Sequence, residues 1–148
     1  MRQTIPFRIV ELEPDSYHMV VEASMSGKSV HLIVDTGASR SLIDISSDSG
    51  LRVEGVDETL AVGFNTDKIS IQLAIFPYIG VGGFTFSDFV AAVTDLDALR
   101  SLYSKVAGMD IAGLLGCDFL VRYVSSINFR TKRIYLKQLT AEVKSSQE

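Results

Sequence analysis

The feature of this sequence that most constrains its fold is an apolar run that ends abruptly in a carboxylate. Leu32, Ile33 and Val34 are aliphatic residues of the kind that form a buried strand. Asp35 follows them directly, and Gly37 suits a tight turn that another backbone approaches closely. A carboxylate at the end of a buried strand costs free energy unless it is paired, hydrogen-bonded or used in chemistry. This turn therefore needs an explanation.

The size and composition of the chain limit the classes to which it can belong. A length of 148 residues predicts one domain, 1–148, with a substantial core, and the polar segment from about 141 to 148 is expected to fray. A net charge of −4 without a basic patch argues against nucleic acid as a partner. No apolar run is long enough to cross a membrane, so we expect no membrane partner either.

Cysteine and histidine usage points away from disulfides and cofactors. The lone Cys117 cannot form an internal disulfide, and together with His18 and His31 it falls short of the usual zinc-ligand sets. We therefore expect no metal and no other cofactor. The N-terminus lacks the uninterrupted apolar core of a signal peptide, and a cytoplasmic protein is the simplest expectation.

Apolar periodicity and turn residues predict a mostly β chain with one or two short helices, arranged as a closed or partly closed barrel. Glycines and polar residues mark the hairpin turns at 26–28, 63–67 and 82–83. The glycines at 80–83 are not followed by a helix pattern or by Lys-Ser/Thr, which argues against a phosphate loop. The expected strands are 5–12, 17–25, 29–34, 58–62, 68–75, 76–81, 84–93, 126–129 and 133–139, and 41–45 is a short strand or the start of a helical turn.

The segment 95–107 is the clearest helix of the sequence. Gly108 is placed to end it, and Asp95 or Asp97 to cap its start. A second apolar stretch, 111–120, predicts a strand that contains two glycines and is followed by a helical turn. The apolar residues of the helix recur at helical spacing, so we expect one core-facing side made of Leu96, Leu99, Leu102, Tyr103 and Val106.

A second Asp-Ser-Gly, at 48–50, has to be weighed against the first acidic turn. Polar Ser46 and Ser47 lead into it instead of an apolar strand. Aspartate and glycine are ordinary residues of a loop or of a helix end. We interpret this second sequence as a turn.

Two motifs together resemble the retropepsin-like aspartic peptidases, the family of the retroviral proteases. Val34-Asp35-Thr36-Gly37-Ala38-Ser39 is followed about 75 residues later by Gly113-Leu114-Leu115-Gly116. In that family an Asp-Thr/Ser-Gly loop is crossed by a strand that ends in two apolar residues and a glycine. The resemblance covers roughly 17–137, and the ending at 118–120 is similar to the bacterial members. It implies an acid-protease-type barrel with one Asp-Thr-Gly per subunit and with 113–116 behind the loop.

The resemblance also implies an activity, hydrolysis of peptide bonds in a peptide or protein substrate. Two carboxylates about 3 Å apart share one proton, because both cannot ionise at that distance. One then acts as the base on a water molecule while the other stabilises the developing charge on the substrate carbonyl. This chain supplies one credible catalytic aspartate, Asp35. It would therefore meet the same residue of a second copy on the two-fold axis of a homodimer.

Other site residues follow from the same resemblance. Thr36 would hydrogen-bond to the partner loop, Gly37 would place its backbone beside the carboxylates, and Ala38 and Ser39 complete the loop. Segments 133–139 and 5–12 are candidates for strands exchanged at the dimer interface. The tip of the hairpin around 63–67 is a candidate flap over the substrate. An apolar cleft beneath it would favour apolar side chains beside the scissile bond. The candidate residues are Val62, Gly63, Phe64 and Asn65 in the flap, and Ile43 and Leu114 in the cleft.

The sequence departs from the retroviral pattern in two places and leaves alternatives open. Retroviral proteases carry an aspartate where this chain has Ser39 and an arginine where it has Cys117, so a neutral arrangement replaces their ion pair. The N-terminal strands and the helix at 95–107 are additions without a functional account. Three alternatives remain. The chain forms a catalytically inactive dimer that binds peptides, or the Asp35 turn is purely structural. The third is a two-carboxylate glycosidase that uses Asp35 and Asp118 about 5 to 10 Å apart.

Overall fold

The computed structural model describes residues 3–61, 68–138 and 143–145, with side chains for all of these except 54–61 and 68–71. The first half of this chain forms β1 (Thr4–Pro6), β2 (Arg8–Glu13), β3 (Ser16–Met25), β4 (Lys28–Val34), β5 (Leu42–Asp44), a 3-10 turn η1 (Ile45–Ser47), β6 (Leu51–Ala61) and β7 (Lys68–Val81). The second half forms β8 (Phe84–Thr94), α1 (Asp97–Ala107), β9 (Ile111–Leu115), α2 (Cys117–Tyr123), β10 (Val124–Asn128), β11 (Arg133–Leu136) and β12 (Val143–Ser145).

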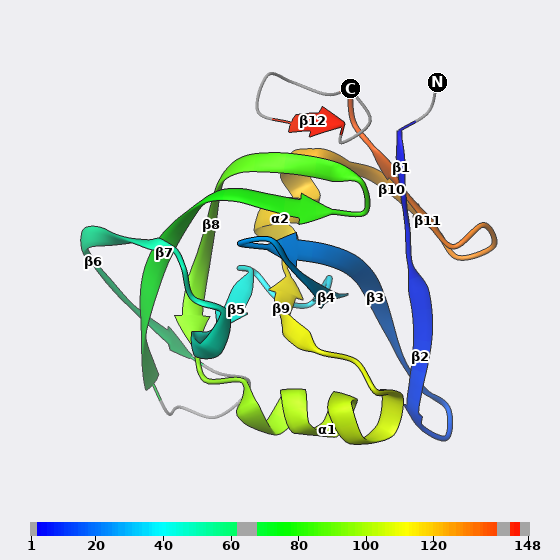
Figure 1. The fold of residues 1–148 in the computed structure, drawn as a ribbon, viewed down its shortest axis with the longest axis horizontal. Coiled ribbons are helices and arrows are strands. Elements are labelled where there is room, and N and C mark those ends of the chain that lie inside the picture. Colours follow the sequence, from blue (N-terminus) through cyan, green and yellow to red (C-terminus); the bar gives the residue numbers. More distant parts are fainter. Residues whose placement is uncertain (1–2, 62–67, 139–142, 146–148) are drawn as a thin grey trace.

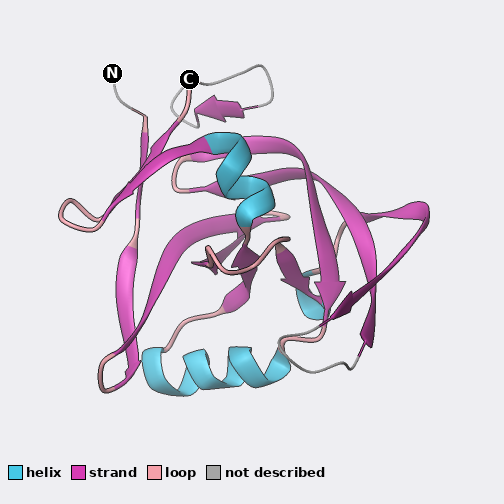
Figure 2. Ribbon diagram, turned by 180° about the vertical axis from the view of Figure 1, so that it is seen from behind, coloured by secondary structure: helices cyan, strands magenta, loops and turns pink. Residues whose placement is uncertain are grey.

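Six strands close into a barrel, which confirms the predicted fold class. β8, β5, β9, β4, β3 and β7 are hydrogen-bonded neighbours in this order, and β7 pairs again with β8 to close the ring. Figure 1 and Figure 2 show α1 lying across one end of this barrel and α2 near the other. The two hairpins predicted around 63–67 and 82–83 share β7, which runs without a break from 68 to 81.

Strand β9 occupies the centre of the arrangement, between β4 and β5. It runs parallel to β4 and antiparallel to β5, so two segments that flank the Asp-Thr-Gly turn are both paired with a strand from the far end of the chain. Gly113 permits this approach, because a Cβ at that position would lie 2.0 Å from the carbonyl oxygen of Leu42. The glycine in the predicted strand is therefore explained by the close contact of two backbones.

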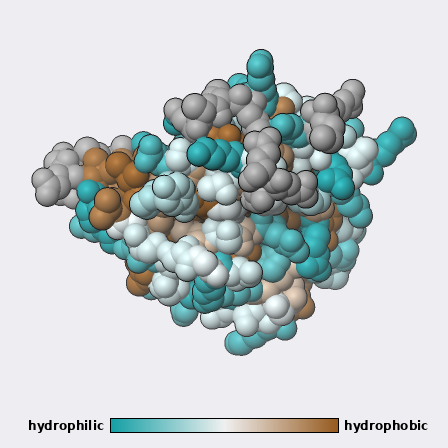
Figure 3. Space-filling view, turned by 45° about the horizontal axis from the view of Figure 1, so that its top comes forward, coloured by the Kyte–Doolittle hydropathy of each residue, from teal (hydrophilic) through white to brown (hydrophobic). Residues whose placement is uncertain are grey.

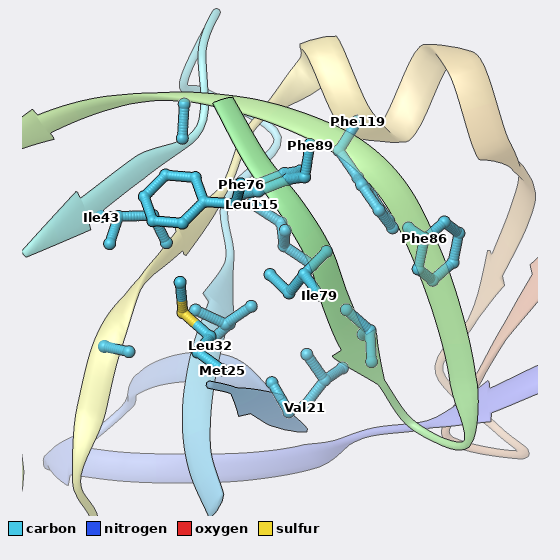
Figure 4. Close-up of a cluster of buried hydrophobic side chains, with 14 of the residues drawn as sticks. Val21, Met25, Leu32, Ile43, Phe76, Ile79, Phe86, Phe89, Leu115 and Phe119 are labelled. Carbon is cyan, nitrogen blue, oxygen red and sulfur yellow. The ribbon is translucent and has the colours of Figure 1, made fainter. Parts of the chain in front are cut away.

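The alternating inward residues of the barrel strands build the main core. Figure 4 shows side chains of β3, β4, β5, β7, β8 and β9 converging with Phe119 of α2. Phe86 and Phe119 pack edge to face, with ring centroids 4.9 Å apart. This interior is apolar, as period-two strands with one buried face require. Ile43 belongs to it and is 0% exposed.

A second apolar cluster lies under α1, and it corrects the expected face of this helix. Tyr103 is fully buried there against β2, β3 and β9, and burial raises the pKa of Tyr103 to about 12. Leu99 packs on the same cluster. Leu102 and Val106 were expected in the core but are 43% and 51% exposed. The buried face is narrower than the apolar pattern, because α1 covers only the outer surface of the sheet and not a closed interior.

The ends of α1 follow the sequence in part. Gly108 ends the helix with a left-handed backbone (φ 64°), as predicted. At the start of the helix the N-cap residue is Leu96, so neither Asp95 nor Asp97 occupies the capping position that we expected for one of them. The Leu96 N–H instead donates to the carboxylate of Asp44, 2.7 Å away on β5, while Asp95 accepts from the N–H of Asp97.

The chain ends pair within the molecule. β11 lies between β1 and β10, so both of its edges are occupied inside the chain, and β2 pairs with β3. Both edges of β11 are thus paired within this single chain, and an exchange of 133–139 between two subunits stays a prediction. The C-terminal segment expected to fray contains β12, which pairs with β8.

The surface of the molecule carries both hydrophilic and hydrophobic residues. On the face drawn in Figure 3 hydrophilic residues dominate, and hydrophobic surface gathers on the side where β6 and β7 lie in Figure 1. No helix in the described part of the chain is long and apolar enough to span a membrane.

Candidate active site

Asp35 lies at the point where β4 leaves the barrel. Its N–H donates to the carbonyl of Leu115 on β9 over 3.0 Å, which continues the parallel ladder into the turn. The Gly37 N–H donates to Oδ1 of Asp35 over 2.9 Å, and the Ala38 N–H donates to the Asp35 carbonyl over 3.2 Å. The carboxylate is half-buried, while Thr36 and Gly37 are exposed. The turn thus fixes one carboxylate oxygen by a backbone donor and keeps the group accessible.

The residues that follow β9, Gly116 and the first residue of α2, make further contacts with the loop. The Cys117 N–H donates to the Ala38 carbonyl over 2.7 Å, and the Cys117 thiol donates to the Thr36 carbonyl over 3.1 Å. Gly116 touches the loop so closely that a Cβ there would lie 2.8 Å from the Ala38 carbonyl oxygen. Leu115 therefore holds the start of the loop at Asp35, and Cys117 holds the loop further along, at Thr36 and Ala38.

A polar network behind the loop was not found by the sequence interpretation. Oδ1 of Asp118 accepts from the N–H of Ser41 over 2.9 Å, from the Ser41 hydroxyl over 2.8 Å and from the Phe119 N–H over 2.9 Å. The Ser41 hydroxyl in turn accepts from the Gly116 N–H over 3.0 Å, and Ser41 is 0% exposed. This network ties α2 to the end of the loop.

The arrangement at Ser39 and Cys117 is neutral, in keeping with the departures noted in the sequence. Ser39 is exposed, and the Cys117 thiol donates a hydrogen bond to the Thr36 carbonyl. Asp118 is the acidic side chain that reaches the loop region from α2, and it is bound to Ser41. No local pattern in the sequence signals this pairing, because its partners are 77 residues apart.

A pocket of about 400 Å³ opens beside the carboxylate of Asp35. Its walls come from β2, β3, the end of β4 and the turn between β10 and β11. Glu11 lies opposite Tyr17 in the β2–β3 ladder, and its negative charge raises the pKa of Tyr17. The lining residues are Ile9, Tyr17, His18, Met19, Ile33, Val34, Asp35, Thr36 and Phe129.

Neither of the cleft residues expected from the sequence lines this pocket. Ile43 is wholly buried in the barrel core and is not accessible to a substrate in this structure. Leu114 is half-buried and packs against the cluster under α1, and its place in a substrate cleft stays a prediction. The flap candidates Val62, Gly63, Phe64 and Asn65 lie outside the described residues. The strands on either side of them, β6 and β7, are antiparallel and pair as far as Ala61 with Lys68.

The second Asp-Ser-Gly is a structural turn. Gly50 N–H donates to Oδ1 of Asp48 over 3.1 Å, and Asp48 also forms an ion pair with Arg52. The hydrogen bond from Arg52 lowers the pKa of Asp48, against the opposing effect of its partial burial. In the described part of the chain no three side chains of the metal-ligating types gather at one point.

A six-stranded barrel whose Asp-Thr-Gly loop is crossed from behind by a glycine-containing strand defines a class, the single-barrel acid proteases. The family model described as aspartyl protease matches residues 21–119, more than half of the sequence, and the chain belongs to this family. Among solved structures its fold is similar to that of a retropepsin-like aspartic protease from Rickettsia conorii, with a TM-score of 0.52 and 18% sequence identity over 92% of this chain and 94% of that chain. No curated protein sequence matches the chain significantly. The fold is thus retropepsin-like, as the resemblance in the sequence implied.

Proposed function

We propose that this protein is an aspartic endopeptidase that is active as a homodimer, with Asp35 and its copy in the second subunit as the catalytic pair. The observation that carries this proposal is the state of Asp35. It is an accessible carboxylate at the end of a buried strand, and its position is fixed by a backbone donor of its own turn, the Gly37 N–H, and by a backbone acceptor on β9, the Leu115 carbonyl. Membership of the aspartyl protease family supports the same activity.

The need for a second subunit follows from what the single chain offers. Asp-Thr-Gly occurs once in the sequence. Asp118 is committed to three hydrogen bonds behind the loop, and Asp48 is committed to Arg52. A pair of carboxylates sharing one proton therefore requires a second copy of Asp35, supplied by two-fold symmetry.

In such a pair the ionised carboxylate takes a proton from a water molecule as the water attacks the peptide carbonyl carbon. The protonated carboxyl donates a hydrogen bond to the carbonyl oxygen, where negative charge develops. The Gly37 N–H, already bound to Oδ1, holds the Asp35 group in one orientation during these steps. No covalent bond to the protein forms, and the shared proton ends on the leaving amine.

The experiment that tests this function replaces Asp35 by Asn and measures cleavage of a diverse peptide library between about pH 3 and 7, where carboxylate pairs change protonation. Asp35→Asn should abolish cleavage while the protein remains folded and dimeric. Asp48→Asn is the matched control, because Asp48 accepts from the glycine two residues later in the same way, and it should retain activity.

A tandem protein with two copies of the chain joined by a flexible linker tests the shared pair directly. One Asp35→Asn substitution in either half should abolish cleavage, since each half holds one carboxylate of the pair. Residual activity near half of the unmodified tandem would show that each subunit works alone and would refute the dimer mechanism. A dimer that cleaves no peptide at any pH tested would favour the inactive peptide-binding alternative.

A further inference from the structure

A single arginine side chain, Arg100, joins α1 to two strands of the barrel. Its Nε donates to the carbonyl of Ile111, the first residue of β9, over 2.8 Å. One terminal nitrogen donates to the carboxylate of Asp110 over 3.0 Å, and the other donates to the carboxylate of Asp44, the last residue of β5, over 3.4 Å. The side chain of Asp44 is only 3% exposed. A helix without a functional account in the sequence is thus bound to β5 and β9, which pair with each other beside the Asp-Thr-Gly turn.

Strand β9 has a β-bulge next to these contacts. In the parallel β4–β9 ladder His31 lies opposite Ile111, but the next residue of β4, Leu32, lies opposite Gly113. Ala112 is therefore an extra residue on β9, which the ladder leaves unpaired. The extra residue shifts the pairing of every later residue of β9 by one position.

The shifted pairing decides which residue lies beside Asp35. After the bulge Val34 pairs with Leu115, and the Leu115 carbonyl accepts the Asp35 N–H over 3.0 Å. Val34 and Leu115 both face the barrel core. Without the bulge Val34 would lie opposite Leu114, which packs on the other side of the sheet against the cluster under α1, since a slip of one residue exchanges the two faces. The position of Asp35 therefore depends on the bulge.

The residues just before the bulge are held from both β4 and α1. The His31 N–H donates to the Asp110 carbonyl over 2.9 Å. The Asp110 carboxylate binds Arg100 and also lies 3.2 Å from the ammonium of Lys28 at the start of β4. The guanidinium of Arg100 presents its donors in fixed directions and reaches three acceptors at once, whereas the single ammonium of a lysine cannot reproduce this geometry. These contacts fix the start of β9 against β4.

We propose that Arg100 is a positioning residue of the peptidase and that α1 supports the Asp-Thr-Gly loop from the far end of β9. Arg100 holds the start of β9 before the bulge at Ala112, and the bulge sets the pairing of the later residues of this strand. That pairing brings the Leu115 carbonyl to the Asp35 N–H. The inference rests on the proposed function, because it takes Asp35 as the catalytic group.

Amide hydrogen exchange of the full-length protein, measured by NMR, tests this placement without a substrate. Arg100→Lys keeps the positive charge but loses the fixed set of donors. It should raise the exchange rates of the His31 and Asp35 N–H groups by about tenfold relative to those of residues 79–81 in β7, because the start of β9 opens more often. Arg52→Lys is the matched control, because Arg52 likewise binds a carboxylate and a side chain of a neighbouring strand, and it should leave these relative rates unchanged.

Kinetics with a cleaved peptide then separate positioning from a general loss of stability. At a temperature where each variant is folded, Arg100→Lys should lower kcat by about 10- to 100-fold, because a displaced Asp35 is badly aligned for the reaction. KM should change by less than about twofold, since ground-state binding is retained. Val143→Ala is the matched control for stability, because it removes buried volume on β12 and should destabilise the protein without changing kcat.

The outcomes separate this inference from the proposed function. Exchange rates and kinetics of Arg100→Lys that resemble those of Val143→Ala would make Arg100 a contact for stability alone and would overturn the inference, with the peptidase assignment intact. Full activity and unchanged exchange in Arg100→Lys, with losses only in Arg100→Gln, would show that charge suffices and would also overturn it. If the unmodified protein cleaves no peptide, the proposed function fails. The relative exchange rates then decide the placement by themselves, since faster exchange at Asp35 supports it and unchanged exchange overturns it.

Discussion

The hydrogen bonds between Ser41 and Asp118 give the most quantitative prediction about the loop. Asp118→Ala removes the acceptor of three donors, of which the N–H and hydroxyl of Ser41 are fully buried. Net hydrogen bonds contribute about 1 kcal/mol each, and a buried donor left without a partner costs about 1–3 kcal/mol. The three bonds share one oxygen of a half-buried side chain, so their contributions overlap. We expect Asp118→Ala to lower the free energy of unfolding by about 2–3 kcal/mol.

Ser41→Ala should cost about 2 kcal/mol, because it removes the hydroxyl that donates to Asp118 and leaves the buried Gly116 N–H without its acceptor. The bond between the two side chains is lost in both single variants. The double variant should therefore be about 1 kcal/mol less destabilised than the sum of the single effects. Asp118→Asn keeps a carbonyl oxygen at the same place and should cost about 1 kcal/mol.

The assay is urea unfolding at one fixed protein concentration, since the proposed dimer would make apparent stability depend on concentration. Asp95→Ala serves as the control, because Asp95 accepts one backbone N–H in an exposed position, and it should change stability by less than about 1 kcal/mol. Under conditions where each variant is folded, Asp118→Ala should also lower kcat/KM toward a good substrate, because a small displacement of the loop misplaces Asp35. Single effects that add to within about 0.3 kcal/mol would refute the coupling.

Two further predictions concern contacts of β9 and β5, the barrel strands next to the loop. Gly113→Ala should destabilise the protein by about 3 kcal/mol in urea unfolding, because the new Cβ meets the β5 backbone. Gly80→Ala is the control and should cost less than about 1 kcal/mol, because its Cβ would meet only the rotatable Ser24 hydroxyl. Equal losses of stability in the two variants would contradict this reasoning. Burial by itself would raise the pKa of Asp44, but hydrogen bonds from Ser46 and from the Leu96 N–H, with the charge of Arg100, hold its pKa below the usual value. The stability from ionised Asp44 is thus present above the unfolded pKa of about 3.9 and is lost as pH falls through the lower folded pKa. The stability difference between the unmodified protein and Asp44→Asn should be constant above about pH 5 and shrink below about pH 4; a difference that stays constant down to about pH 2.5 would contradict it.

The sequence alone determined those parts of the protein that local physical chemistry encodes. The apolar run before Asp35 specified a buried strand, Gly108 specified the end of α1, and the turn residues specified hairpins. The two-part motif around Asp35 and Gly113 indicated the acid-protease type of barrel through its resemblance to a known family. The structure then gives the physical reason for Gly113, the close approach of the β5 backbone.

Only the tertiary structure decided which distant segments meet. The link from Ser41 to Asp118 and the pocket wall made by Ile9 and Phe129 join residues far apart in the chain, and no local propensity records such pairings. Burial is likewise a property of the assembled barrel. Ile43 and Leu102 are both aliphatic residues expected to be apolar contacts, yet one lies at the centre of the core and the other on the outer face of a helix, because hydrophobicity favours burial without specifying where.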